Sequence, residues 1–415
     1  MIRKPPGIED IFPDRTPKWN FIINTAIESF NNYNYKEIII PILEFSEVFI
    51  SGLGSETDIV TKEMFTLKDR GGRSLTLRPE GTASAVRAYI ENGDYHRLSS
   101  CKFFYNGPMF RAERPQKGRL RQFNQFGAEL FGSPNPYYDY EIISLMNTIA
   151  KKLQIKNYSL LINSIGCSAC RMDYNNELKS YYIGHSDKLC NDCKIRLEKN
   201  PLRLLDCKNE SCTELKKNAP IISGYLCDEC KDHHSILKDY LDMTAVDYIE
   251  DAHLVRGLDY YTKTTFEFVS TNLGGQNAFA AGGRYDNLVE SFGGKPTPAV
   301  GFAAGVERIF MLTNEQKSEN TLDLFLIHSG DNALHKLIEL SEILRANKFS
   351  VDLDPNSRGF KSQFKKANRE NAKFTIIIGE EELSTNMYTI KNLQTGKQEK
   401  IDAACLIDSL TSLIS

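Results

Sequence analysis

The sequence predicts an α+β protein whose antiparallel sheet is interrupted by a cysteine-rich, mostly helical insertion and is followed by a separate α/β domain. Three observations support this prediction. Few helices separate the strand-like segments of residues 1–160, as expected for an antiparallel sheet. Eight of the ten cysteines lie between positions 167 and 230. Strands and helices alternate after the polar stretch at 313–321, which is typical of a linker.

The elements of the first domain follow from apolar periodicity and from turn residues. Thr16 and Pro17 form a typical helix start, and apolar residues continue at helical spacing to Phe30. Short apolar or alternating runs predict strands at 37–41, 74–78, 103–105, 121–128, 264–269 and 279–281. A helix is predicted over 303–312. Because strand patterns return near position 250, the cysteine-rich segment interrupts one domain.

In the C-terminal part, predicted strands and predicted helices follow one another in turn. This order is typical of a partly parallel sheet. Its strands are predicted at 322–328, 350–353 and 374–379, and its helices at 332–346 and 360–371. We therefore expect a first domain built from residues 1–160 and 244–314, an insertion at 161–243, and a C-terminal domain at 322–415.

Composition restricts the class of protein. The chain has 415 residues, of which 41% are hydrophobic and 25% charged, which is an ordinary globular balance. The formal net charge of -3 means that any nucleic-acid surface is local. No apolar run follows the basic N-terminal residues, and the longest runs, at 38–43 and 374–378, are far shorter than a membrane helix. We expect a soluble cytoplasmic protein without a membrane partner.

An arginine-rich hairpin is predicted at 110–125. Five basic residues between positions 111 and 121 surround Glu113, and Pro115 and Gly118 indicate a turn. Arginine on a strand can hold a phosphate through two parallel hydrogen bonds, and Phe123 could stack on a base. The alternative is a solvated charged hairpin.

Two further arginines stand in unusual surroundings. Arg256 precedes a glycine and two tyrosines, and Arg308 follows the small residues of 301–305, which permit close approach of a ligand to the backbone. Three separated arginines suited to phosphate indicate a nucleotide enzyme. The sequence has neither a Gly-x-x-x-x-Gly-Lys-Ser/Thr loop nor a dinucleotide fingerprint after a strand.

The clustered cysteines form four closely spaced pairs: Cys167 and Cys170, Cys190 and Cys193, Cys207 and Cys212, Cys227 and Cys230. Such pairs in an intracellular chain favour zinc over disulfides. Eight thiolates suffice for two closed structural sites. One site with leftover thiols, replacement of a cysteine by His233, and reduced inert cysteines are the alternatives.

Several stretches resemble the class II aminoacyl-tRNA synthetases. The residues 111–113 with the loop after them resemble motif 2, 305–308 resemble motif 3, and Pro41 after a helix and a strand is similar to the loose motif 1. The stretches at 76–82, 254–261 and 281–286 resemble histidyl-tRNA synthetases in particular. The resemblance covers nearly the whole chain, although the cysteines depart from the pattern of many members.

This resemblance implies a two-step reaction. Histidine and ATP, with Mg²⁺, give histidyl-adenylate and pyrophosphate, and the histidyl group then moves to the 3′ end of tRNA(His). The substrate carboxylate is the nucleophile, so the protein supplies positioning and charge stabilisation. The implied catalytic residues are Arg111 and Arg256 near the α-phosphate and Arg308 at the far end of ATP. Glu113 and Phe123 would contact adenine. A homodimer is also implied.

The histidine site has a physical logic beside the resemblance. Neutral imidazole has one donor and one acceptor nitrogen, and the resemblance implies that Glu129 and Tyr261 serve them. A carboxylate also offsets the charge of the α-ammonium group. The implied histidine-binding residues are Glu80, Gly81, Thr82, Arg111, Gln125, Glu129, Arg256, Tyr260, Tyr261 and Tyr285.

Basic residues in two places are candidates for tRNA contacts. In the hairpin these are Arg114, Lys117, Arg119 and Arg121. In the C-terminal domain Lys361, Lys365, Arg369 and Lys373 recur every four residues, beside an apolar stripe of Phe360, Phe364 and Ala367. A solvated helix face is the alternative, but resemblance to the class II anticodon-binding domain favours tRNA.

Two other functions compete with this one. The regulatory subunit of ATP phosphoribosyltransferase resembles the synthetase core but is a binding module, and it generally lacks the C-terminal domain and keeps the arginines poorly. Synthetases for other amino acids share motif 2 but not the 256–261 stretch. The presence of the C-terminal domain, the three arginines and that stretch favours a histidine-specific synthetase.

Overall fold

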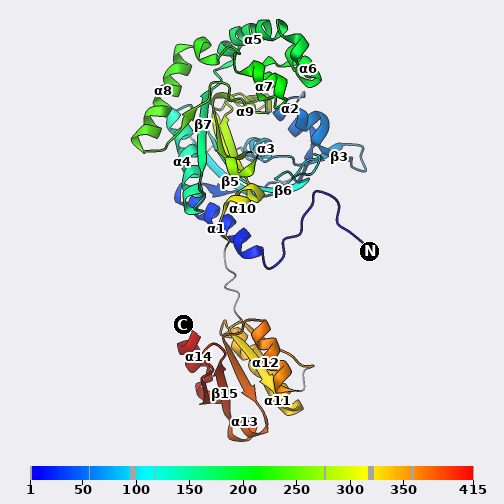
Figure 1. Ribbon diagram of the computed structural model, residues 1–415, viewed down its shortest axis with the longest axis vertical. Coiled ribbons are helices and arrows are strands. Elements are labelled where there is room, and N and C mark those ends of the chain that lie inside the picture. The colour runs from blue at the N-terminus through cyan, green and yellow to red at the C-terminus, as the bar shows by residue number, and fades with distance from the viewer. Residues whose placement is uncertain are drawn as a thin grey trace. The chain divides into compact units, whose positions relative to one another are not determined.

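The computed structural model describes residues 2–55, 57–93, 100–116, 118–274, 277–315, 322–356 and 359–414. The chain divides into two compact units, residues 1–316 and 317–415 (Figure 1). Within the described ranges, no helix has both the length and the apolar character that crossing a bilayer requires.

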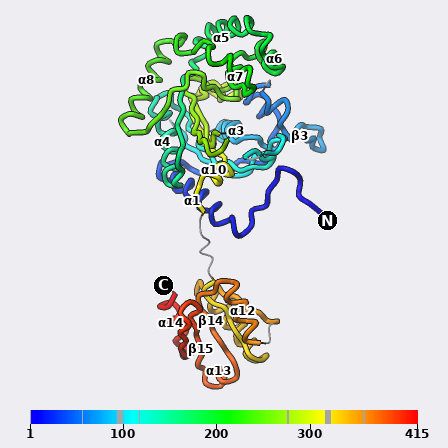
Figure 2. The backbone as a smooth tube through the Cα atoms, in the orientation of Figure 1, coloured from blue at the N-terminus to red at the C-terminus, as the bar shows by residue number. Residues whose placement is uncertain are grey.

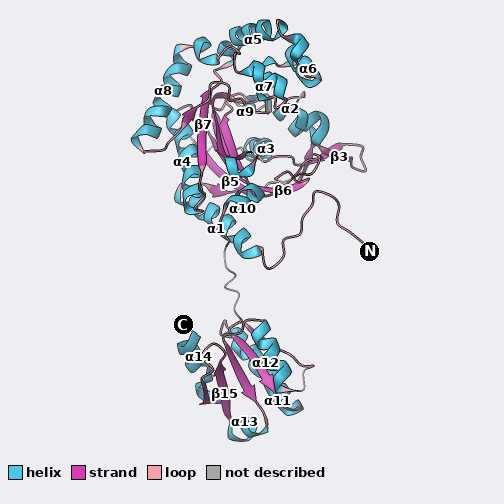
Figure 3. Ribbon diagram, in the orientation of Figure 1, coloured by secondary structure: helices cyan, strands magenta, loops and turns pink. Residues whose placement is uncertain are grey.

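An eight-stranded sheet forms the centre of the first unit, with helices around it (Figure 3). Its order is β1-β5-β6-β11-β10-β9-β7-β8, antiparallel except for the two outermost pairs. The strands are β1 Lys36–Glu37, β5 Cys101–Phe110, β6 Gln122–Phe131, β7 Tyr158–Ser164, β8 Ile249–Glu250, β9 Thr262–Ser270, β10 Ala278–Arg284 and β11 Ala299–Gly305. The predicted antiparallel α+β fold is confirmed.

Smaller elements complete the first unit. A second sheet has the order β2-β4-β3. Its strands are β2 Leu43–Phe45, β3 Phe65–Lys68 and β4 Ser74–Leu77. The helices outside the insertion are α1 Thr16–Asn32, α2 Ser46–Leu53, α3 Thr82–Asn92, α4 Pro136–Lys152, α9 Leu288–Ser291 and α10 Val306–Leu312, with the short π-helix η1 Ile59–Glu63.

The large sheet separates a hydrophobic core from a polar face. Phe126, Ala128 and Leu130 of β6 pack into a core with α1 and α4. Successive side chains of a strand point to opposite faces, so Gln125 and Glu129 lie on the other face. The alternation along β6 therefore sets both the core and the surface on which the candidate site is built.

The insertion forms one end of the first unit, drawn in green in Figure 2. It consists of helices α5 Ser168–Ile183, α6 Asn191–Lys199, α7 Glu210–Lys216 and α8 Asp228–Met243, with short 3₁₀ turns that include η4 Pro201–Asp206. Its mostly helical character is confirmed. The predicted boundary at 161 falls inside β7, which pairs with β9 up to Ser164.

Two predictions of local structure in the first unit are wrong. The strand predicted at 37–41 ends at Glu37, and Ile39 is 92% exposed; Pro41 also lacks the N–H that a ladder needs. The helix predicted over 303–312 begins only at Val306, because Ala303 to Gly305 pair with β6 as the end of β11. Small residues fit a strand here because they leave room on the polar face.

The second unit is the predicted partly parallel α/β domain. Its sheet has the order β13-β12-β14-β15-β16, with β12 parallel to both neighbours. The strands are β12 Leu324–His328, β13 Val351–Leu353, β14 Phe374–Ile378, β15 Met387–Asn392 and β16 Gln398–Asp402. The helices are α11 Asp331–Ala346, α12 Phe360–Arg369, α13 Glu380–Thr385 and α14 Leu406–Ile414.

Candidate active site

A cleft lies on the polar face of the large sheet and spans about 730 Å³, part of which is open solvent. Its floor is formed by β6, β10 and β11, and α10 and the hairpin loop form its walls. Seven of the predicted residues lie around it or in contact with it: Arg111, Glu113, Phe123, Gln125, Arg256, Arg308 and Arg119. Arg111 and Arg308 therefore share one cavity, although they lie 197 positions apart in the sequence.

Each of the three predicted catalytic arginines is held by protein atoms. The Arg111 Nε donates to the Pro79 carbonyl at 3.0 Å, and the guanidinium lies 5.2 Å from the Phe123 ring centre. Arg256 forms an ion pair with Glu267, while its buried Nε has no hydrogen-bond partner among the described residues. An unsatisfied buried donor is costly, so this nitrogen is suited to a ligand.

Arg308 occupies the most crowded position for positive charge. Its Nε donates to the Gly118 carbonyl at 3.1 Å, and Nη1 donates to the Ala278 carbonyl. Burial, followed by the nearby charges of Arg119 and Arg111, lowers the pKa of Arg308 to about 10. An anion bound in the cleft would relieve this repulsion.

The hairpin tip is less open than the sequence suggests. Arg119 forms a 2.8 Å ion pair with Glu113, and the Arg121 Nε donates to the Glu113 carbonyl at 3.1 Å. Both side chains are half-buried, whereas Arg114 is exposed. Lys117 lies outside the described residues. Of the three predicted tRNA contacts in the loop that the structure describes, Arg119 lines the cleft and Arg114 faces solvent.

A buried carboxylate lies beside this cleft. Glu129 is fully buried and accepts hydrogen bonds from three hydroxyls, those of Thr82 at 2.7 Å, Tyr105 at 3.1 Å, and Tyr285. Burial raises the pKa of Glu129 to about 8, although these hydrogen bonds act in the opposite direction. A carboxylate held this way can accept a further proton or a polar N–H from a ligand.

Glu80 and its neighbours build the wall next to Glu129. Both Glu80 oxygens accept backbone N–H groups at the start of α3, from Thr82 at 2.6 Å and Ala83 at 2.8 Å. Burial raises the pKa of Glu80. A Cβ on Gly81 would lie 2.2 Å from the Tyr105 ring, so only glycine fits there. Glu80 is therefore a helix cap as well as a candidate ligand group.

The remaining predicted residues lie in a buried cluster around Glu129 or at the edge of the cleft. The rings of Tyr260 and Tyr261 lie 4.6 Å apart, and those of Tyr260 and Tyr285 lie 5.6 Å apart. The buried Oε1 of Gln125 has no partner within the described part of the chain. A Cβ at Gly301 would lie 1.7 Å from the Glu129 carboxylate, which explains the absence of a side chain at that position.

Sequence reasoning missed several residues. Tyr105 and Glu267 lie within strands and belong to none of the motifs, although each bonds a predicted site residue. The inserted domain contributes Arg203, Asp206 and Lys208 to a wider cleft that adjoins the first. No signal in the sequence places these three residues there, because the contact depends on how the insertion packs.

Arg284, in the middle of a stretch with family resemblance, has a structural role. It is fully buried, and its Nε donates to Asp139 Oδ2 at 3.1 Å. Although burial acts in the opposite direction, the Arg284 charge holds the pKa of Asp139 below its usual range. The next residue, Tyr285, is the one that reaches Glu129.

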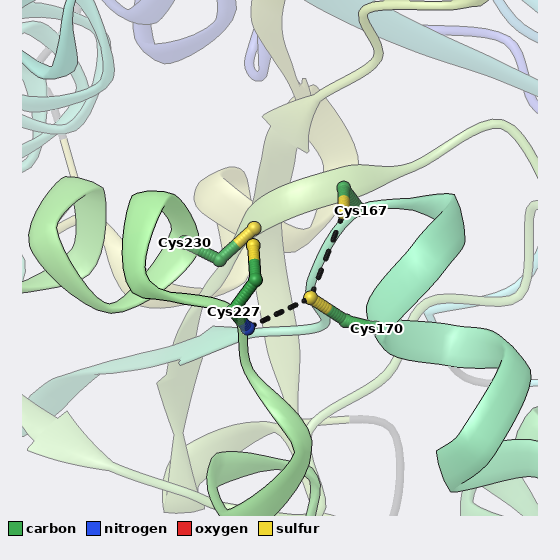
Figure 4. Close-up of side chains that lie close together, drawn as sticks. All are labelled: Cys167, Cys170, Cys227 and Cys230. Atoms are coloured by element: carbon green, nitrogen blue, oxygen red, sulfur yellow. Dashed lines mark hydrogen bonds between the residues drawn. The ribbon is translucent and has the colours of Figure 1, made fainter.

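The eight clustered cysteines form two groups of four. Cys167 and Cys170 meet Cys227 and Cys230, and Cys190 and Cys193 meet Cys207 and Cys212; in each group the sulfur atoms lie within 4.8 Å of one another. Figure 4 shows the first group at the starts of α5 and α8. The Cys227 backbone N–H donates to the Cys170 sulfur at 3.1 Å. The pairing that the sequence left open is thus fixed by the fold.

His233 does not join either group. Its Nε2 lies 3.3 Å from the Asp139 carboxylate, which also bonds Arg284. The α8 helix carries Cys230 and His233 to different neighbours, so the alternative in which His233 replaces a cysteine is wrong.

In the second unit, the predicted basic stripe is shorter than expected. Lys361, Lys365 and Arg369 are exposed on α12, but Lys373 lies beyond the helix and bonds Asp323 at 2.9 Å. Phe364 and Ala367 pack against the sheet as predicted, whereas Phe360 is 43% exposed. The helix ends at Arg369, before the stripe can continue.

The comparisons with known proteins cover both units. Residues 7–309 match the family described as histidyl-tRNA synthetase, and residues 323–413 match the anticodon binding domain. A histidine–tRNA ligase of Halothermothrix orenii is 47% identical over 417 residues, covering 100% of both chains. One of Caldanaerobacter subterraneus is 46% identical over 420 residues, covering 100% of this chain and 99% of the relative.

A solved structure agrees with these sequence relatives. The crystal structure of apo S. aureus histidyl-tRNA synthetase superposes with a TM-score of 0.84 at 38% identity, covering 99% of this chain and 100% of that one. The match extends over the large sheet, the insertion and the C-terminal unit alike. The chain therefore belongs to the histidyl-tRNA synthetase family.

Proposed function

We propose that the protein activates L-histidine with ATP and transfers the histidyl group to the 3′ end of tRNA(His). The observation that carries the proposal is the buried Glu129, bonded by three hydroxyls, beside a cleft that holds Arg111, Arg256 and Arg308. The Glu129 cluster would hold the imidazole, and the cleft with the three arginines would hold the phosphates. Two such sites are what a histidine-activating enzyme needs.

In the first step, the substrate carboxylate attacks the α-phosphorus of ATP and pyrophosphate leaves. Negative charge grows on the phosphate oxygens, and fixed guanidiniums stabilise it without reorganising. Arg111 and Arg256 would face the α-phosphate and Arg308 the far phosphates, while Glu113 and Phe123 would contact adenine. ATP would arrive with Mg²⁺, which adds positive charge along the phosphates.

Selection of histidine would depend on Glu129 and the tyrosines. Glu129 would accept the imidazole N–H, and the Tyr261 hydroxyl would serve the other nitrogen. Glu80, Gly81, Thr82 and Gln125 would surround the α-amino group. Tyr260 and Tyr285 would complete the walls of the pocket. In the second step, the terminal adenosine hydroxyl attacks the histidyl carbonyl and AMP leaves.

The deciding experiment is ATP–pyrophosphate exchange measured with each of the twenty amino acids. Exchange that depends on histidine alone supports the proposal. Exchange with another amino acid would mean a different specificity. No exchange with any amino acid would favour a binding module such as a synthetase-like regulatory subunit.

We also propose that each group of four cysteines binds one structural zinc ion. Four sulfurs within 4.8 Å of one another match the ligand set of a closed tetrahedral site. Such a site leaves no open position for catalysis. The zinc ions would instead hold together an insertion made of short helices.

Protein purified without chelator is expected to contain about two zinc ions per chain by elemental analysis. Cys170→Ser and Cys212→Ser should each remove about one ion, because each breaks a different group. Cys405→Ser is the matched control, since this exposed cysteine lies outside both groups. Metal-free, folded protein would rule out the zinc proposal and leave the enzyme proposal intact.

Two basic surfaces are proposed as tRNA contacts. Arg114, Arg119 and Arg121 of the hairpin, with Lys117 in the same loop, would meet the acceptor end. Lys361, Lys365 and Arg369 on α12 would meet the anticodon region. The match of this unit to anticodon binding domains supports the second assignment.

Reversing two charges on α12, with Lys361→Glu and Lys365→Glu, is expected to weaken tRNA binding about tenfold. The slope of the logarithm of the binding constant against the logarithm of the salt concentration should become shallower by about one to two. Histidine-dependent exchange should stay unchanged, because this step does not use tRNA. Filter binding at several salt concentrations measures both quantities. Lys348→Glu with Lys397→Glu, at exposed positions of the same unit, controls for net charge; an equal effect there would mean that the contact is not local.

Finally, we propose that the protein is a cytoplasmic homodimer. Several apolar side chains next to the first unit's small sheet are exposed, including Ile39 at 92%, Ile42 at 45% and Phe45 at 47%. A cluster of this kind is typical of an interaction surface. Light scattering that gives the mass of a single chain would exclude the dimer.

A further inference from the structure

The inserted domain shares its hydrophobic core with the candidate histidine pocket. One cluster of buried side chains contains the inner cysteines of both groups together with Tyr260, Tyr261 and Tyr285. The insertion therefore packs against the sheet domain through buried side chains and is not linked to it by the chain alone. It packs against the residues that the proposed function assigns to histidine.

The closest contacts fall on one loop, residues 253–261, which we name the recognition loop. It carries Arg256, Tyr260 and Tyr261 and has no regular secondary structure between β8 and β9. An irregular loop needs outside support if its side chains are to stay in place. The Leu53 carbonyl, Asn163 and Glu267 hold parts of the loop from the sheet domain, and the insertion supplies further support.

Two side chains of the insertion bond to the C-terminal half of the recognition loop. The Arg171 Nη1, next to Cys170, donates to the Tyr261 carbonyl at 3.0 Å. The Asn200 Nδ2, at the start of η4, donates to Asp259 Oδ1 at 2.9 Å. The far end of the loop is tied as well, since His253 Nε2 lies 3.2 Å from the Ala219 carbonyl.

Packing adds to these hydrogen bonds. A Cβ on Gly257, the residue after Arg256, would lie 3.5 Å from the Asp206 carboxylate of the insertion. Asp206 and Arg171 are each next in sequence to a cysteine of one of the two groups. Both cysteine groups therefore sit one residue away from a contact with the recognition loop.

We infer that the inserted cysteine-rich domain positions the recognition loop, with Arg171 and Asn200 as the positioning residues that set the affinity for histidine. The inference rests on the proposed function, because it assigns Tyr260 and Tyr261 to the histidine pocket. Neither residue lines the cleft or the wider cleft beside it. Arg171 holds the backbone carbonyl of Tyr261, and Asn200 holds the side chain of Asp259.

The test compares Michaelis constants in histidine-dependent exchange with full-length, metal-loaded protein. Arg171→Ala and Asn200→Ala are each expected to raise KM for histidine about tenfold, because a small displacement of the loop misaligns the pocket. KM for ATP should change less than about threefold, since Arg111, Arg308 and Phe123 lie on other elements. The rise in melting temperature caused by histidine should shrink in parallel.

Exchanging the two side chains of the Asn200–Asp259 hydrogen bond tests whether the effect of Asn200→Ala comes from the loss of that bond. Asn200→Asp alone places two carboxylates together and should raise KM for histidine further than alanine does. Adding Asp259→Asn restores an amide–carboxylate hydrogen bond with the roles reversed. The double variant should therefore recover most of the affinity for histidine.

Arg196→Ala is the matched control. Arg196 also joins the insertion to the rest of the unit, but it bonds Asp58 next to η1, at 2.8 Å, and not the recognition loop. It should lower thermal stability without changing KM for histidine. If Arg171→Ala and Asn200→Ala behave like Arg196→Ala, or if the exchange of partners restores nothing, the inference is wrong. If the parent protein shows no histidine-dependent exchange, the proposed function has failed instead.

Discussion

Replacing Arg256 by alanine is expected to lower the rate of histidine-dependent ATP–pyrophosphate exchange by about 10²–10³-fold. Arg256 lines the cleft, and its buried Nε has no partner within the described residues. A donor held in this way gains its interaction when charge develops on the α-phosphate. The loss should appear mainly in kcat, because the interaction strengthens in the transition state.

Two further variants separate the loss of the Arg256 guanidinium from the effect of leaving Glu267 unpaired. Removing Arg256 leaves the Glu267 carboxylate without its ion pair, so Arg256→Ala combined with Glu267→Gln tests whether a stray negative charge causes the loss. Arg256→Lys keeps the charge but not the planar fork, and it should recover only part of the rate. A rate within about threefold of the parent for Arg256→Ala would exclude a catalytic role.

Replacing Glu129 by glutamine is expected to raise KM for histidine about 10–100-fold, because the amide presents an N–H where the carboxyl group offers an acceptor at a buried position. KM for ATP should stay nearly constant, since Glu129 lies on the histidine side of the cleft. Exchange kinetics at varied histidine and ATP concentrations measure both constants. An equal rise in both would mean that the substitution disturbs the whole sheet.

The same variant tests the raised pKa of Glu129. The folded protein holds this carboxyl proton up to a pKa of about 8, whereas an unfolded glutamate loses its proton near 4.3. Between these values the folded state binds more protons, so the free energy of unfolding of the ligand-free protein falls as pH rises through this window and levels off above it. The fall is on the order of a few kcal/mol.

Denaturant unfolding at several pH values measures this fall. Because other groups also titrate, the informative quantity is the difference between the parent and Glu129→Gln. That difference should change with pH between about 4.3 and 8, because the parent loses unfolding free energy over this range and the variant does not. A difference that stays constant over this range would show that Glu129 ionises normally.

What the sequence determined by itself was the set of local patterns. The two-residue period of β6 and the turn at Pro115 predicted the hairpin, and the polar stretch at 313–321 predicted the boundary between the units. These signals are local, because backbone geometry and apolar burial repeat within a few residues. The motif residues were also recognised, since each motif is a short contiguous stretch.

The tertiary structure alone decided which distant residues meet. Pairing of the four cysteine pairs, the hydroxyl of Tyr105 on Glu129, and the contact of Arg171 with the recognition loop join positions that are 14 to 90 residues apart. Spacing along the chain carries no information about such contacts, because they depend on how whole elements pack. The sequence therefore predicted the family, and the fold decided how the insertion packs against the loop that carries Arg256, Tyr260 and Tyr261.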